Sequence, residues 1–70
     1  MELSARNQLA GTVRSVKLGE VMAEVLVDVG GQELVAVITR GSAERLGLAE
    51  GKPVTAIIKS TEVLLATDAG

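Results

Sequence analysis

The sequence predicts an all-β fold, a small five-stranded Greek-key barrel with one short helix between the third and fourth strands. Three observations support this. Residues 21–29 alternate cleanly between two faces, which is the period of a strand, and strand-like segments lie on either side. Residues 41–48 break that period, and two more strand-like segments follow. This order of elements fits an OB-type barrel.

The first three strands are predicted from alternation and from the turns between them. Leu9–Lys17 form the first, and Leu18-Gly19-Glu20 a tight turn. Val21–Val29 form the second, with the valines at odd positions sharing one face with Ala23. Gly30-Gly31 then supplies a hairpin turn, because glycine tolerates positive φ. The third strand, residues 32–39, is apolar on both faces, so we expect both of its faces to be covered.

The helix is predicted over Gly41–Leu48, about two turns. Ser42 is the expected N-cap, and Glu44 in the first turn favours the helix dipole. Gly47 stands where a C′ glycine belongs, and Leu48 follows as the apolar residue of a Schellman closure.

The last two strands are predicted over Lys52–Lys59 and Glu62–Thr67, with Glu50-Gly51 as the turn before them. Pro53 stands at the start of the fourth strand, where no ladder N–H is lost. The sequence has no linker, low-complexity segment or obvious internal repeat, so we expect residues 1–70 to form one domain.

The composition restricts the chemistry. The chain of 70 residues has no His, no Cys and no aromatic residue, which removes disulfides and nearly excludes a zinc site. A chain this short buries only roughly 60% of its unfolded surface. Because 47% of the residues are hydrophobic, we expect oligomerisation to cover part of the apolar surface.

The charge and hydropathy patterns argue against several partners. A net charge of −2 with mixed signs and no aromatic residue argues against nucleic acid. No apolar run approaches the roughly 20 residues of a membrane span. The segment Met1-Glu2-Leu3-Ser4 lacks the features of a signal peptide, so we expect a cytoplasmic protein without membrane association.

Two polar clusters are the candidate functional residues. Ser4, Arg6 and Asn7 form the first, and Lys59-Ser60-Thr61 the second. Each has a simple alternative, a solvated N-terminal tail for the first and a solvated turn for the second. Arginine offers a planar fork of donors, and hydroxyls and amides add neutral ones, so the first cluster also suits an anion.

Catalytic residues are not expected. The remaining acids and bases are carboxylates and lysines in no recognisable pair. Glu20, Glu24 and Asp28 are spaced by four along one strand and fit a solvated stripe or an interface rim. We therefore predict a binding protein and not an enzyme.

Several motifs in order resemble those of a known family. They are Ser4-Ala5-Arg6-Asn7-Gln8, Gly11-Thr12-Val13, Ala23-Glu24-Val25, Ala36-Val37-Ile38-Thr39, Leu46-Gly47-Leu48, Glu50-Gly51, Val54-Thr55-Ala56-Ile57-Ile58-Lys59 and Leu64-Leu65-Ala66-Thr67-Asp68. Together they cover residues 3–68 and resemble the molbindins, the molybdenum-pterin-binding (Mop) domains. The combination is specific, although each motif alone is weak.

The resemblance implies an OB-like barrel that binds molybdate and tungstate as intact oxyanions in the cytoplasm, for storage and homeostasis. It implies a homo-oligomer, a hexamer built as a trimer of dimers, with ions held between subunits. By position, Ser4 and Arg6 match the family's oxyanion ligands, as do Lys59 and Ser60, and Asn7 has a supporting role. The physics agrees, since charge-assisted hydrogen bonds to a dianion are strong.

A second class of oxyanion site in the family uses mostly backbone groups, and the resemblance places Val21 and Met22 there. No residue is expected to coordinate the metal centre directly, and no organic cofactor is expected, because no aromatic ring is present to stack a pterin.

Two other functions remain open. A nucleic-acid-binding OB module fits the barrel, although such modules use aromatic residues and basic grooves. A regulatory or accessory domain that senses molybdate within a larger assembly is the second.

Overall fold

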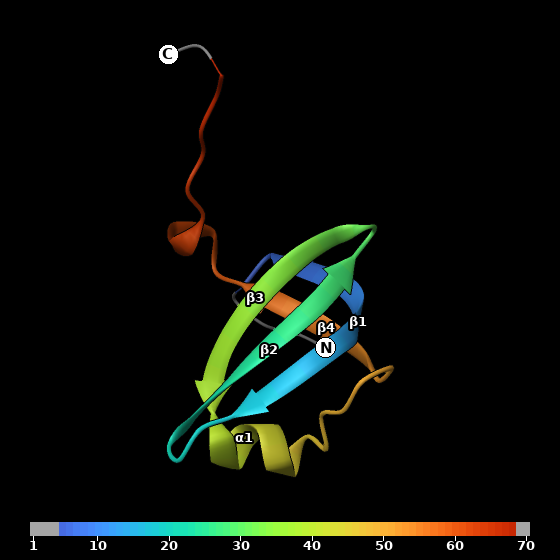
Figure 1. The fold of residues 1–70 in the computed structure, drawn as a ribbon. Helices are drawn as coiled ribbons and strands as arrows, with labels where there is room; N and C mark the ends of the chain where they lie inside the picture. Colours follow the sequence, from blue (N-terminus) through green and yellow to red (C-terminus); the bar gives the residue numbers. More distant parts are fainter. Residues whose placement is uncertain (1–4, 69–70) are drawn as a thin grey trace.

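The computed structural model describes residues 5–68 and shows an antiparallel sheet of four strands in the order β3-β2-β1-β4 (Figure 1). A short helix, α1, follows β3 and lies at one end of the sheet. The elements are β1 (Asn7–Leu18), β2 (Met22–Val29), β3 (Gln32–Thr39), α1 (Arg40–Arg45), β4 (Pro53–Ile58) and a 3₁₀ turn (Ser60–Glu62). The prediction of a mostly β chain with one helix after the third strand is therefore confirmed.

Strand β1 is the centre of the sheet because its two halves pair with different partners. Its first half pairs with β4 as far as Thr12, and its second half pairs with β2 from Thr12 to Leu18. A register shift between Val13 and Ser15 marks a β-bulge, which bends a strand and increases its twist. Gly11 allows the close approach at this bend, since a Cβ there would lie 2.7 Å from the carbonyl oxygen of Asp28.

The core consists of valines on the concave face of the sheet. Val13, Val25 and Val27 are buried together, and Ala43 of α1 is buried as well. The predicted inward face of β2 is thus confirmed over Ala23, Val25 and Val27. The prediction is wrong for Val21, which precedes β2 and is exposed.

The outer face of β3 is uncovered within one chain. Val35 and Val37 are exposed there, whereas Leu34, Ala36 and Ile38 pack against the core. The expected cover of both faces is therefore not supplied by the chain itself.

The hairpin between β2 and β3 has the predicted turn. Gly30 and Gly31 both have positive φ, 58° and 85°, which is the backbone that this tight turn requires. The amide of Gly31 also donates to the Asp28 carboxylate at 3.0 Å.

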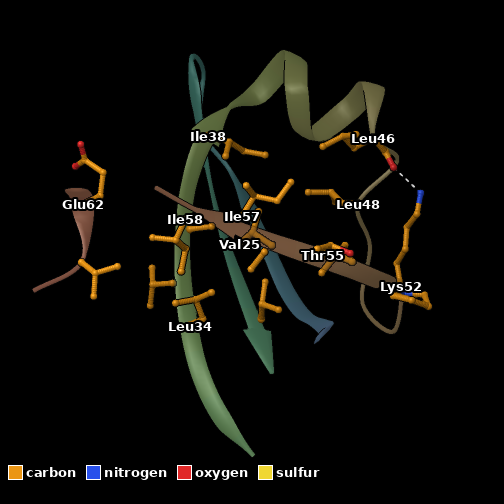
Figure 2. Close-up of a pocket in the computed structure, with 17 residues that line it drawn as sticks. Val25, Leu34, Ile38, Leu46, Leu48, Lys52, Thr55, Ile57, Ile58 and Glu62 are labelled. Carbon is orange, nitrogen blue, oxygen red and sulfur yellow. Dashed lines mark hydrogen bonds between the residues drawn. The ribbon is translucent and has the colours of Figure 1, made fainter. Parts of the chain in front are cut away.

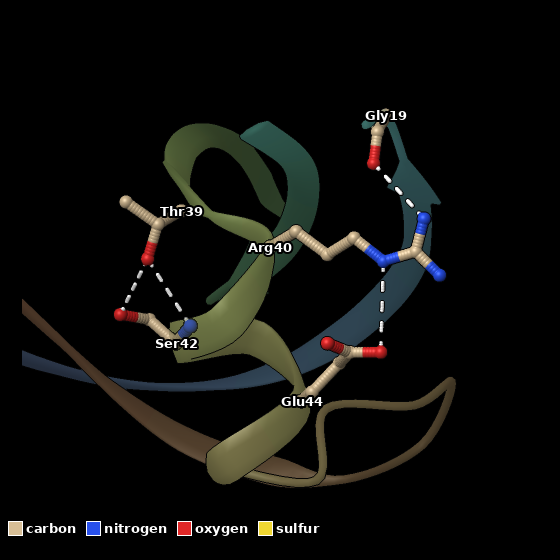
Figure 3. Close-up of polar contacts among 5 residues, drawn as sticks. All are labelled: Gly19, Thr39, Arg40, Ser42 and Glu44. Carbon is tan, nitrogen blue, oxygen red and sulfur yellow. Dashed lines mark hydrogen bonds and ion pairs between the residues drawn. The ribbon is translucent and has the colours of Figure 1, made fainter. Parts of the chain in front are cut away.

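Helix α1 begins earlier than predicted. Thr39 is the N-cap and accepts a hydrogen bond from the amide of Ser42 at 3.1 Å, so the prediction of Ser42 as N-cap is wrong (Figure 3). No acidic residue lies in the first turn, because the early start moves Glu44 to the fifth helical position. There its carboxylate pairs with Arg40 Nε at 3.5 Å.

The end of α1 is the predicted Schellman closure. Gly47 has φ of 62°. Its amide donates to the backbone carbonyl of Glu44 at 3.0 Å, and the amide of Leu48 donates to the backbone carbonyl of Ala43 at 3.1 Å. Lys52 Nζ adds a hydrogen bond to the carbonyl of Leu46, where the carbonyls at a helix end lack partners.

The fifth strand is absent from the sheet, so the prediction of a strand over Glu62–Thr67 is wrong for the isolated chain. The chain turns once through Ser60–Glu62 and then runs away from the sheet (Figure 1). Leu64 and Leu65 are each 93% exposed. The turn points this segment away from the open edges of β3 and β4, where a fifth strand would pair. We call residues 63–68 the C-terminal arm.

Candidate functional site

The pairing of β1 with β4 brings the two predicted polar clusters together. The last pair of this ladder is Asn7 with Ile58. Because the strands are antiparallel, Arg6 precedes this pair on one strand and Lys59 follows it on the other. The two cations therefore lie at the same end of one sheet, although 53 positions separate them in the sequence (59 − 6 = 53). Ser4 lies outside the described residues.

Ser60 and Thr61 continue this cluster from the β4 side. Lys59 is extended, with φ of −64° and ψ of 138°, and stands directly before the 3₁₀ turn that Ser60 begins. The turn is closed by the amide of Glu62, which donates to the Lys59 carbonyl at 2.9 Å. Lys59 and Ser60 are both exposed, while Asn7 is half-buried. Their polar groups therefore face solvent at the joint between β4 and the C-terminal arm.

Arg6 and Lys59 differ from the other cations in what surrounds them. Within residues 5–68, neither side chain forms an ion pair or a hydrogen bond. Lys17, the other cation without such a contact, has Glu24 as its cross-strand neighbour. Two exposed cations at the same end of a sheet, neither paired with a carboxylate within residues 5–68, create a local positive potential that favours an anion.

The start of β1 is held in place by its own contacts. Ala5 is buried, and Gln8 Nε2 donates to its carbonyl at 3.3 Å. Arg6 therefore lies between buried Ala5 and Asn7, which pairs with Ile58. These neighbours fix the backbone of Arg6, while its side chain is exposed to solvent.

The second predicted site lies at the other end of β1. Val21 is 71% exposed in the turn between β1 and β2, and Met22, the first residue of β2, is exposed beside it. Arg40 fixes this turn with two hydrogen bonds. Its backbone amide donates to the carbonyl of Val21 at 2.8 Å, and its Nη1 donates to the carbonyl of Gly19 at 3.2 Å (Figure 3). The structure thus separates Val21 and Met22 from Arg6 and Lys59 by the length of a strand of 12 residues.

An apolar groove is the feature that the sequence reasoning missed. It has a volume of about 770 Å³ and lies on the concave face of the sheet, between β3 and β4. Figure 2 shows the lining residues Leu34 and Ile38 of β3 and Ile57 and Ile58 of β4, with Glu62 apart from them at one end. Apolar residues on both faces of β3 and β4 were the only signal for it in the sequence. We call this space the β3–β4 groove.

The described residues offer no site for a metal cation. Between residues 5 and 68, no group of three or more His, Cys, Asp or Glu side chains could hold such an ion. In the same part of the chain, no helix is long and apolar enough to cross a membrane.

The chain has clear relatives. Residues 3–65 match the TOBE domain. Molybdenum-pterin-binding protein 1 of Clostridium pasteurianum is 46% identical over 66 residues, which are 93% of this chain and 97% of that protein. A molybdate-binding protein from Sporomusa ovata has a similar structure, with a TM-score of 0.91 and 43% identity over 96% of this chain and 100% of that one.

A longer relative has been solved with its ligand. The cytoplasmic molybdate-binding protein ModG, with molybdate bound, has a TM-score of 0.83 and 49% identity. The similarity covers 86% of this chain and 43% of that one. The chain therefore belongs to the TOBE-domain family and, within it, to the molybdenum-pterin-binding (Mop) proteins.

Proposed function

We propose that this chain binds molybdate or tungstate reversibly at the end of the β1–β4 pair. The observation that carries the proposal is the position of Arg6 and Lys59 directly beyond the Asn7–Ile58 pair, at the same end of the ladder and with no carboxylate partner within residues 5–68. A tetrahedral dianion between them would accept charge-assisted hydrogen bonds, which are roughly twice as strong as neutral ones. Ser4, Asn7 and Ser60 would add neutral donors from the same two segments.

Binding by hydrogen bonds leaves the oxyanion intact. The chain has no thiolate or imidazole that could replace an oxygen at the metal centre. The ion can therefore be taken up and released without a chemical step, which suits storage and homeostasis better than catalysis. The backbone groups around Val21 and Met22 would form the second class of site.

We further propose that the working form is a homo-oligomer, a hexamer arranged as a trimer of dimers. The exposed apolar residues support this. The C-terminal arm carries Leu64 and Leu65, and burying a leucine side chain fully contributes about 1.5–3 kcal/mol. The outer face of β3 adds Val35 and Val37.

The occupant proposed for the β3–β4 groove is the C-terminal arm of a second copy. Both strands, β3 and β4, are edges of the four-stranded sheet, and an edge strand offers backbone N–H and C=O groups to a further strand. The arm has six residues, 63–68, and β4 also has six, so an extended arm matches the length of the open edge. A strand at this position would join β3 to β4 and close the sheet into the predicted OB-like barrel.

We place the protein in the cytoplasm because the related ModG is described as cytoplasmic, and we propose that residues 1–70 form one domain because the TOBE domain matches residues 3–65.

Titration of the purified protein with molybdate, tungstate and sulfate tests the function. The wild type should retain molybdate and tungstate in equilibrium dialysis. Arg6→Ala should raise the molybdate Kd by about 10- to 150-fold, because a hydrogen bond to a charged group contributes about 1.5–3 kcal/mol. Arg45→Ala is the matched control, since it removes an exposed arginine from α1, far along the chain from the site. Failure of the wild type to retain either oxyanion would contradict the proposal.

A further inference from the structure

The joint between β4 and the C-terminal arm belongs to the proposed oxyanion site and to the proposed subunit contact at once. Lys59 and Ser60 supply a cation and a hydroxyl to the site, and only the 3₁₀ turn Ser60–Glu62 separates Lys59 from Val63. The joint therefore stands between an ion-binding end and an apolar end.

The joint is held weakly within one chain. Two backbone hydrogen bonds close it, Glu62 to Lys59 at 2.9 Å and Val63 to Ser60 at 3.4 Å, and no side chain caps it. Residues 59–63 are all exposed. Few contacts and exposed backbone hydrogen bonds are typical of segments that open locally at low cost. The direction of the arm thus depends on what else fixes these residues.

An oxyanion would fix the joint from one side. Arg6 has an anchored backbone at the start of β1, since Ala5 is buried and Asn7 pairs with Ile58. An ion shared by Arg6, Lys59 and Ser60 would tie the joint to this fixed point on the sheet.

Docking of the arm would fix the joint from the other side. Glu62 and Val63 already line the chain's own β3–β4 groove, with Glu62 at one end of it (Figure 2), whereas Leu64 and Leu65 are not among its lining residues and are exposed. Once those leucines are held by a second copy, the joint is constrained at Val63. Two ligands that order the same segment favour each other, and the effect is reciprocal.

Building on the proposed function, we infer that oxyanion binding and docking of the C-terminal arm are coupled through the joint Lys59–Glu62. Leu64 and Leu65 thereby act as positioning residues for the oxyanion site without contacting the ion. Molybdate should strengthen the subunit contact by the same factor by which the contact strengthens molybdate binding.

The sharpest test loosens the joint and leaves every side chain in place. Insertion of Gly-Gly-Ser between Glu62 and Val63 should keep the oligomer, because the arm can still dock, while the molybdate Kd rises about tenfold or more. The same insertion between Gly30 and Gly31 is the matched control, since this turn is exposed and open. Calorimetric titration gives the Kd, and native mass spectrometry gives the oligomer. A Kd equal to that of the wild type for the joint insertion would overturn the coupling.

A second variant tests the same coupling from the apolar end. Leu64→Asp combined with Leu65→Asp should abolish assembly and weaken molybdate binding at least tenfold, although Arg6, Lys59 and Ser60 are unchanged. A monomer that binds molybdate with wild-type affinity would overturn the inference. The two proposals fail differently. Absence of molybdate binding by the wild type refutes the function, whereas wild-type affinity in either arm variant refutes only the coupling.

Discussion

The cations near the two ends of strand β1 differ in whether their side chains have hydrogen-bond or ion-pair partners. At the end near α1, Arg40 contacts Glu44 and the carbonyl of Gly19 (Figure 3), and Lys52 donates to the carbonyl of Leu46 at the end of the helix (Figure 2). At the other end, Arg6 and Lys59 have no such partner within the described residues. Arg40 and Lys52 thus join elements of the fold at the first end, where Lys17 has no such contact within residues 5–68 but has Glu24 as its cross-strand neighbour. Cations at the second end add like-charge repulsion, which an anionic ligand would relieve.

The largest effect should come from removing both unpartnered cations. Arg6→Ala with Lys59→Ala should raise the molybdate Kd more than about 100-fold, because two charge-assisted contacts are lost. The melting temperature without oxyanion should stay the same or rise slightly, since neither side chain has a partner to lose among the described residues. Calorimetry and thermal unfolding measure the two quantities.

The control for that double variant removes two cations elsewhere, Lys17→Ala with Arg45→Ala. It should leave the molybdate Kd within about twofold of the wild type. A similar loss of affinity in the control would mean that the overall charge, and not the pair at the end of β1 and β4, controls binding.

A smaller effect, on stability alone, is expected at the opposite end. Thr39→Ala removes the N-cap of α1 and should lower the free energy of unfolding by about 1 kcal/mol. Urea denaturation without oxyanion measures this loss. The molybdate Kd for the first site should not change, and a parallel rise would show that the two ends are not independent.

The smallest effect is expected for Arg40→Met. The variant keeps an apolar stem but loses the exposed pair with Glu44 and the hydrogen bond to Gly19, which together contribute less than about 1 kcal/mol. If unfolding became easier by several kcal/mol, the cations near α1 would have to be far more important to the fold than exposed contacts allow.

The sequence predicts the local structure well where the signals are local. The Gly30-Gly31 turn, the Gly47 closure of α1 and the inward face of β2 all depend on neighbouring residues, and all are confirmed. The N-cap was misplaced because Thr39 and Ser42 are both good capping residues and only the backbone decides between them.

The features that depend on distant residues were harder to predict. Nothing local in the sequence indicates that Arg6 and Lys59 lie at the same end of the sheet, because this placement follows from the register of β1 with β4. The fifth strand was predicted from an apolar segment that is real, yet a strand forms only beside a partner edge. The chain alone does not bring Leu64 and Leu65 to such an edge.

Anomalous diffraction from molybdate-soaked crystals tests the central claim most directly, because the molybdenum position is located without assumptions about the ligand. We predict a peak between the Arg6 guanidinium and the Lys59 ammonium, at the end of the β1–β4 pair. A peak confined to the turn that carries Val21 and Met22, with none beside Arg6 and Lys59, would contradict the account.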